Sequence, residues 1–262
     1  MRFKSYYHYN GFFQYYPDIK KFFDNFQITA KVYNNKLEKK LNSIYEKNLH
    51  YEFFTKNLIV IDAIIKELVQ NAMKANIKRW VIKRYALNPL NEIDYKKSLR
   101  IFKHILYFIK IEEFEKKISD FDFYFCIYFS FHSKVLILHV LNEGYLFPQE
   151  EARIRKKFLE SREIKNVYDY YSHFSDTEEG AGMGIAMIVM LLKQIGLDHR
   201  NFLIFNTNYQ EKNWIVSRVF IPMDLNYKIP RKKFEILLKN SNENSESLRK
   251  KIQNQTLYIP FL

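Results

Sequence analysis

Only six of the 262 residues are glycine, and three of them, Gly180, Gly182 and Gly184, fall within five positions. They belong to the segment EEGAGMGIAMIVMLLKQIG, in which an apolar run of helical character directly follows the last glycine. Glycine lets a backbone approach a ligand closely, and the amides at a helix N-terminus attract anions. The segment therefore predicts an anion-binding loop at the start of a helix.

The spacing of these glycines excludes two common phosphate-binding motifs. The P-loop pattern G-x-x-x-x-G-K-[ST] is absent from the chain. A dinucleotide fingerprint requires G-x-G-x-x-G after an early strand, whereas this chain has G-x-G-x-G late in the sequence and after a polar stretch. The glycine loop belongs to neither class.

A second set of polar side chains lies on a helix predicted over residues 53–76. Glu67, Asn71 and Lys74 are spaced i, i+4 and i+7, so they project from one stripe of that helix. A carboxylate, an amide and an ammonium in this arrangement suit a base, a metal ligand and a phosphate contact, although a solvated helix face has the same pattern. The remaining turns carry apolar residues that we expect in the core: Ile64, Ile65, Leu68, Ala72 and Met73.

A third polar segment, Asn142-Glu143-Gly144, directly follows the apolar run KVLILHVL, which is typical of a strand. A strand end can hold a ligand-reading side chain rigidly, but by itself this segment is an ordinary turn. The three segments together, in this order, favour a ligand site.

At this point the chain resembles the GHKL ATP-binding superfamily, which includes histidine kinases, type II topoisomerases and some chaperones. KELVQNAMKA looks like its N box, Asn142-Glu143-Gly144 stands where it has its first glycine box, Asp-x-Gly, and GAGMGIAMI looks like its second glycine box. The resemblance covers about residues 52–222. More closely, DTEEGAGMGIAMIVMLLKQIGLD is similar to a group of uncharacterised bacterial histidine-kinase-like ATPases that carry Asn in place of that Asp.

The resemblance implies a Bergerat-type fold that holds MgATP, with the charged segment 145–179 as a mobile lid. It implies that Glu67 is the general base of hydrolysis and that Asn71 is an oxygen ligand of Mg²⁺. Lys74 would add a point charge to the phosphates, whose oxygens the amides of Gly182, Met183 and Gly184 would receive. The implied cofactor-binding residues are Asn71, Lys74, Asn142, Gly144, Gly180, Gly182, Met183 and Gly184.

The chain departs from the family pattern in ways that affect its expected activity. Asn142 offers a neutral acceptor to adenine in place of a charged one, and Leu146 stands where a second glycine is expected. None of the seven histidines is directly followed by Asp or Glu, so a kinase acting on its own histidine is not expected. We expect a signalling ATPase or a kinase that acts on a partner protein in trans. The alternative is a nucleotide-gated interaction module without turnover.

The elements that must position these segments are predicted from hydrophobic periodicity and turn signals. After the helix over 53–76 we expect a strand in KRWVIKRYAL, a helix over 91–119, strands in FDFYFCIYFSF and KVLILHVL, and an irregular segment over 145–179. The helix after the glycines and the strands NFLIFNTNY and NWIVSRVFIPM complete the order. This order predicts an α/β two-layer sandwich, a mostly antiparallel mixed sheet covered by helices on one face.

The predicted ATP-binding domain spans residues 52–225, between an aromatic-rich extension over 1–51 and a basic tail over 226–262. NSNENSES in the tail is expected to be mobile.

Composition limits the class of partner. The formal net charge of +13 would attract nucleic acid, anionic lipid or nucleotide phosphates, but the lysines are scattered, so a solvated surface is favoured over nucleic-acid binding. The single cysteine, Cys126, fits a reducing compartment. The chain has no apolar run of membrane-spanning length and no signal peptide, so we expect a cytoplasmic protein without a membrane span.

Overall fold

The computed structural model of the protein describes residues 11–15, 56–108, 125–132, 135–164, 184–209, 212–222 and 226–253. Its strands are β1 (Gly11–Tyr15), β2 (Phe125–His132), β3 (Val135–Glu143), β5 (Phe202–Tyr209) and β6 (Lys212–Pro222). Its helices are α3 (Leu58–Arg84), α4 (Glu92–Phe108), α6 (Pro148–Glu163), α8 (Gly184–Gln194), the short 3-10 helix η1 (His199–Asn201), α9 (Pro230–Asn240) and α10 (Ser245–Gln253).

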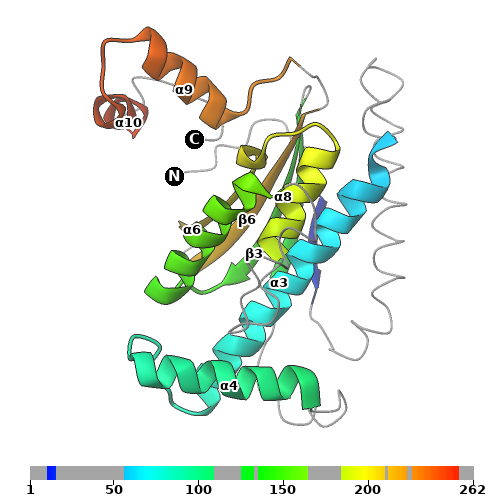
Figure 1. Cartoon of the computed structure of the whole chain (residues 1–262), viewed down its shortest axis with the longest axis vertical. Helices are drawn as coiled ribbons and strands as arrows, with labels where there is room; N and C mark the ends of the chain where they lie inside the picture. The colour runs from blue at the N-terminus through cyan, green and yellow to red at the C-terminus, as the bar shows by residue number, and fades with distance from the viewer. Residues whose placement is uncertain are drawn as a thin grey trace.

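The strands form one sheet in the order β1-β2-β3-β6-β5, and each pairing between the described strands is antiparallel. Helices α3, α6 and α8 lie across the same face of this sheet (Figure 1). The prediction of an α/β fold with an antiparallel sheet and helices is confirmed. Strand β1 lies within the predicted extension over 1–51, so part of that extension belongs to the same sheet as the later strands.

The main core lies between the sheet and two of the helices. Strand β3 alternates, so that Leu136, Leu138 and Val140 face α3 and α8 and are buried. Full burial of one such side chain stabilises the fold by about 1.5–3 kcal/mol. The predicted core stripe of α3 is confirmed for four side chains, which are Ile64, Ile65, Leu68 and Ala72.

Helix α3 is longer than predicted, and the expected strand KRWVIKRYAL is wrong. Ile77, Trp80 and Val81 continue the helical spacing of the earlier turns, and they pack with residues of α4 in a second buried cluster. These residues are β-branched or aromatic and favour strands locally. The segment is nevertheless helical, because the 3.6-residue spacing of its apolar side chains places them on one buried face of the helix.

The end of α3 depends on one residue in the left-handed conformation. Ala86 has a φ of 48°, and the amide of Leu87 donates to the carbonyl of Ile82 at 3.0 Å. This closes the last turn as a glycine at the same position commonly does. Asn88-Pro89 follows and prevents the helix from continuing.

One prediction of irregular structure is wrong, and a segment expected to be mobile lies partly in helices. Residues 148–163 of the expected lid form helix α6, which begins with Pro148 in its first turn and packs against α8. Residues 165–179 of the expected lid lie outside the described residues. The tail contains α9 and α10, and residues 240 and 245–247 of the segment expected to be mobile belong to these helices.

Helix α9 is fastened to the rest of the fold by charged groups. Arg200 of η1 donates to Glu235 of α9 at 2.6 Å and to both carboxylate oxygens of Asp198. These hydrogen bonds lower the pKa of Asp198 to about 2. Figure 1 shows α9 and α10 at the end of the molecule opposite α4. Within the described residues, no helix is both long and apolar enough to cross a membrane.

The left-handed residue at the end of α3 allows a direct test. Ala86→Gly should raise the free energy of unfolding by about 0.5–1 kcal/mol, because glycine adopts a positive φ without steric cost. Urea unfolding measures the change. The matched control is Ala152→Gly on the exposed side of α6, which should lower the same free energy by about 1 kcal/mol. A loss of stability in both variants would contradict this account of the helix end.

Candidate functional site

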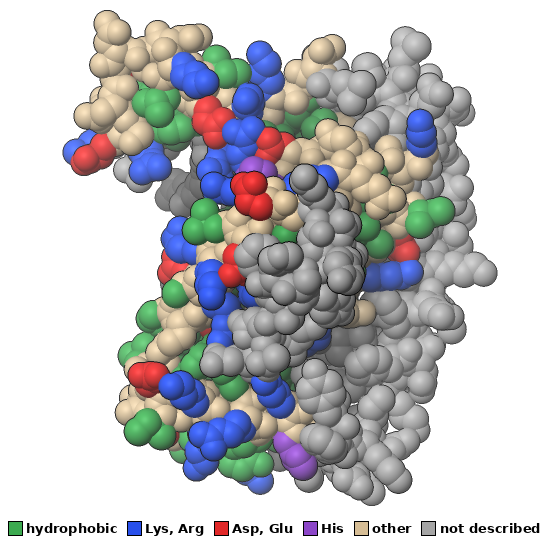
Figure 2. Space-filling model, in the orientation of Figure 1, with side chains coloured by type: hydrophobic (Ala, Val, Ile, Leu, Met, Phe, Trp, Pro, Cys, Tyr) green, Lys and Arg blue, Asp and Glu red, His purple; other side chains and the backbone are tan. Residues whose placement is uncertain are grey.

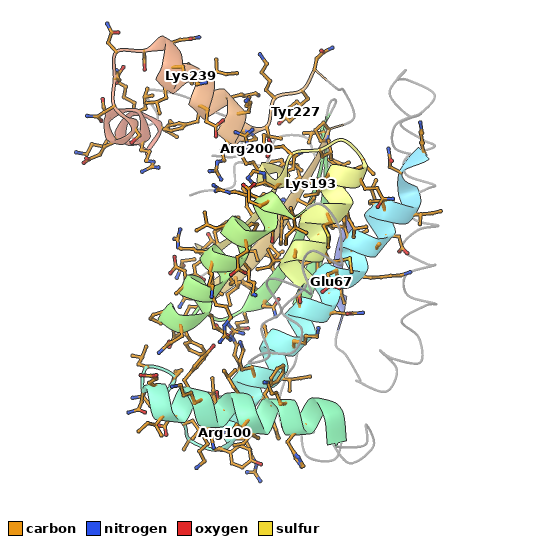
Figure 3. All side chains as sticks on the ribbon, viewed as in Figure 1. Glu67, Arg100, Lys193, Arg200, Tyr227 and Lys239 are labelled. Carbon is orange, nitrogen blue, oxygen red and sulfur yellow. The ribbon has the colours of Figure 1, made fainter. Side chains whose placement is uncertain are left out.

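Two of the predicted segments meet where α8 begins. A Cβ atom built on Gly184 would lie 2.5 Å from Nδ2 and 2.6 Å from Oδ1 of Asn71, and 2.6 Å from Oε1 of Glu67. The first residue of α8 thus lies directly on the polar stripe of α3, so close that any side chain at this position would displace the ends of Asn71 and Glu67. Figure 3 labels Glu67 at the middle of α3, beside α8.

Gly184 is the first residue of α8, so the contact with α3 lies at the N-terminus of a helix. The apolar residues Ala186, Ile188, Val189 and Leu192 are buried and hold α8 in the core. The helix N-terminus carries a partial positive charge and backbone amides without helical partners. The first turn of α8 contains no acidic residue. An anion at this end would therefore meet amides together with the Asn71 amide, whereas the Glu67 carboxylate beside them would repel it unless a cation lay between the two.

The remaining predicted residues of the glycine loop, Gly180, Gly182 and Met183, lie outside the described residues. Lys74 is described and exposed. It follows Asn71 by three residues on α3, and the three atoms nearest to a Cβ built on Gly184 belong to Asn71 and Glu67.

Asn142 is buried at the end of β3, and α3 determines how its amide is turned. Its Nδ2 donates to the carbonyl of Ala72 at 2.7 Å and to Oδ1 of Asn76 at 2.9 Å. A backbone carbonyl only accepts hydrogen bonds, so the side chain cannot be flipped without placing two oxygens against each other. Both hydrogens of the amide are used toward α3, and Oδ1 is left to act as an acceptor.

Gly144 forms a turn two residues after this asparagine. Its φ is +121°, which only glycine adopts readily, and its amide donates to the carbonyl of Asn213 at 2.8 Å. A Cβ built on Gly144 would lie 2.9 Å from Nε of Arg79. The glycine is therefore required both by its backbone angle and by the arginine that passes over it.

A buried group of charges lies beside this turn. Glu150 of α6 is 6% exposed, and its carboxylate pairs with Nζ of Lys78 at 2.5 Å and with Nη2 of Arg79 at 3.3 Å. Opposite charges compensate each other at this depth, where a lone charge would be costly.

Sequence reasoning missed these residues because it expected a strand over 78–87 and irregular structure around 150. The continued helical spacing of Ile77, Trp80 and Val81 was the signal that could have placed Lys78 and Arg79 on α3.

The side-chain oxygens beside Gly184 suit a metal ion that takes only one or two ligands from the protein. Among the described residues, no group of three or more His, Cys, Asp or Glu side chains is placed to hold a metal ion. A metal held entirely by such protein ligands is therefore not seen there. The oxygens of Asn71 and Glu67 beside Gly184 fit Mg²⁺, which binds through one or two protein oxygens and takes the others from phosphates and water.

Lysine and arginine side chains are spread over α4, α6 and the α9–α10 end on the face shown in Figure 2. They do not gather into one patch on that face.

Comparison with known proteins gives a distant relative. The chain is 26% identical over 166 residues to an uncharacterised protein of Treponema pallidum (strain Nichols). The match covers 62% of this chain and 30% of that protein, so the chain spans less than a third of the relative's length. No family model matches the chain, and no solved structure matches it.

The direction of the Asn142 amide leads to a prediction about stability. Asn142→Asp should lower the free energy of unfolding by about 1–3 kcal/mol, since an oxygen would replace the donor that faces Ala72 and Asn76. The introduced carboxyl should have a raised pKa, because protonation again provides a donor. Part of the lost stability should therefore return as the pH falls to about 4.

The matched control for this change is Asn206→Asp. Oδ1 of Asn206 accepts from the amide of Leu146 at 3.1 Å, so a carboxylate there keeps the hydrogen bond and stability should change little. Urea unfolding at two pH values measures both variants. Equal stability of Asn142→Asp and the wild type at neutral pH would show that Nδ2 does not donate toward α3.

Proposed function

We propose that this chain is a MgATP-binding domain of the histidine-kinase-like ATPase type, with a Bergerat-type fold. The observation that supports this most is the contact at Gly184, where the start of α8 meets Asn71 and Glu67 of α3. The segments that resemble the N box and the second glycine box are far apart in sequence, and their described parts lie together. This proximity is what the proposed site requires, and the packing of α3 against α8 in the main core brings it about.

The phosphates bind at the N-terminus of α8. Its amides, together with those of Gly182 and Met183 in the glycine loop, receive phosphate oxygens, and the helix dipole favours the negative charge. Asn71 would contribute an oxygen to Mg²⁺, which would supply positive charge to the phosphates. Lys74 is exposed on the same stripe of α3 and adds a positive charge near the phosphates.

The base binds near the turn after β3. Oδ1 of Asn142 accepts a hydrogen bond from the exocyclic amino group of adenine, because both hydrogens of Nδ2 are already used toward α3. Guanine has a carbonyl oxygen in place of that amino group, so two acceptors would face each other. The site therefore prefers ATP over GTP, and its neutral acceptor gives a weaker hydrogen bond than a carboxylate would.

Glu67 is the general base of the reaction. It takes a proton from a water molecule whose oxygen attacks the γ-phosphorus, and the bond from that phosphorus to the bridging oxygen of ADP breaks. The same step with a side chain of a partner protein as the nucleophile is phosphotransfer in trans. Binding without either reaction would make the chain a nucleotide-gated interaction module.

The binding test uses the glycine that allows the contact. Gly184→Ala should leave the protein folded, because the added methyl group meets only the ends of two side chains and because Gly184 does not need a positive φ. It should displace Asn71 and Glu67 and weaken MgATP binding at least about tenfold, or about 1.4 kcal/mol. Titration calorimetry measures the affinity, with Asn71→Ala expected to show a similar loss.

The control for this test is Gly196→Ala. Gly196 has a φ of +75° and no atom within 4 Å of a Cβ built on it. Its replacement should cost about 1 kcal/mol of stability through backbone strain and leave MgATP affinity unchanged. Wild-type protein without measurable MgATP binding would overturn the proposed function, and an unchanged affinity in Gly184→Ala would place the phosphates elsewhere.

A second variant separates binding from chemistry. Glu67→Gln keeps the size of the side chain and removes the base, so MgATP should still bind while phosphate release falls about 100-fold or more. Release of labelled phosphate from ATP measures the rate, with Glu246→Gln on α10 as a control that should match the wild type. If the wild type hydrolyses ATP and Glu67→Gln does so equally fast, Glu67 is not the base.

A further inference from the structure

Arg79 connects three elements around the turn that follows Asn142. Its Nη1 donates to the carbonyl of Ala75 at 2.9 Å, which holds the guanidinium against its own helix. Its Nη2 donates to the carbonyl of Tyr145 at 3.0 Å and pairs with Oε2 of Glu150 at 3.3 Å. One planar group thus joins α3, the turn after β3 and the beginning of α6.

Glu150 completes this connection from the other side. Its Oε2 also accepts from the amide of Phe147 at 3.2 Å, just before the first turn of α6, and its Oε1 pairs with Lys78 at 2.5 Å. The guanidinium of Arg79 lies 5.7 Å from the centre of the Phe147 ring. The turn over residues 144–147 is therefore fixed at Tyr145 by Arg79 and at Phe147 by Glu150. Each of these two side chains also has a partner on α3.

The fit around Gly144 leaves little freedom in this arrangement. Nε of Arg79 would be 2.9 Å from a Cβ at this position, so the arginine occupies the space beside the turn. Asn142 is tied to the same helix through Ala72 and Asn76. Consecutive turns of α3 thus hold both the buried asparagine and the turn that follows it.

We propose that Arg79 and Glu150 are positioning residues for the base-binding end of the site. They hold the turn over residues 144–147 so that Oδ1 of Asn142 and the backbone beside it present a fixed edge to the base. This inference rests on the proposed nucleotide site. Arg79 follows Asn71 by eight residues, about 12 Å along the helix axis, so the two ends of the site respond separately to substitution.

The test compares a ligand that contains the base with one that lacks it. Titration calorimetry with MgATP and with magnesium tripolyphosphate is performed on the wild type and on Arg79→Lys, which keeps the charge and loses the planar fork. Arg79→Lys should weaken MgATP binding about tenfold and leave tripolyphosphate binding unchanged. The control is Arg100→Ala on α4 (Figure 3), which should bind both ligands as the wild type does.

If Arg79→Lys fails to fold, Glu150→Gln tests the same positioning role. A glutamine oxygen still accepts from the amide of Phe147, while the charge opposite Arg79 is removed. The same selective loss of MgATP affinity is expected. Unchanged MgATP affinity in the folded variants, or an equal loss for both ligands, would overturn the inference while leaving the proposed function intact. A wild type that binds neither ligand would overturn both.

Discussion

The packing of α3 against the sheet and α8 is the constraint on which the rest of the structure depends. One face of this helix is buried in the main core, and its next face carries the polar residues of the candidate site. Because a helix turns 100° per residue, burial of Leu68 and Ala72 determines where Glu67 and Asn71 must point. Packing of the apolar core therefore orients the polar side chains of the site. A shift of α3 by one residue in this packing would remove the contact at Gly184.

Polar groups then set the finer geometry at the strand end. Asn142 is buried, and its orientation follows from a backbone carbonyl of α3 that can only accept. The charges of Lys78 and Glu150 are also buried, that of Arg79 is partly buried, and they compensate one another. Buried groups of this kind tolerate few alternative arrangements, since any partner that moves leaves an unsatisfied charge or hydrogen bond. The same helix thus carries the partly buried side chains of Glu67 and Asn71 at one point and a group of paired charges at another.

The fold was predicted correctly where the hydrophobic periodicity and the local preferences of the residues indicate the same element. The apolar stripe containing Ile64 and Leu68, the strand before Asn142 and the helix after Gly184 are all present. Prediction failed where local preference and tertiary packing differ. The segment around Trp80 has strand-forming residues, yet its burial against α4 continues a helix.

Helix α6 was missed for a different reason. It is mostly charged and lacks a clear apolar stripe, so its sequence resembles a loop. Its position is set by the Glu150 ion pairs and by contacts with α8, which no local pattern reveals. The carboxylate that anchors the turn could therefore be found only from the structure.

Strand β1 is synthesised long before the strand with which it pairs. Its sequence GFFQY pairs with β2, so Tyr15 meets Phe125 roughly 110 residues later in the chain. At ribosomal rates of about 5–20 residues per second, this aromatic segment waits on the order of 10 seconds before its partner is synthesised. During that time an unpaired hydrophobic strand is open to pairing with other chains. The edge strand of the finished sheet is thus open to wrong pairing for longer than it would be if β2 followed it directly in the chain.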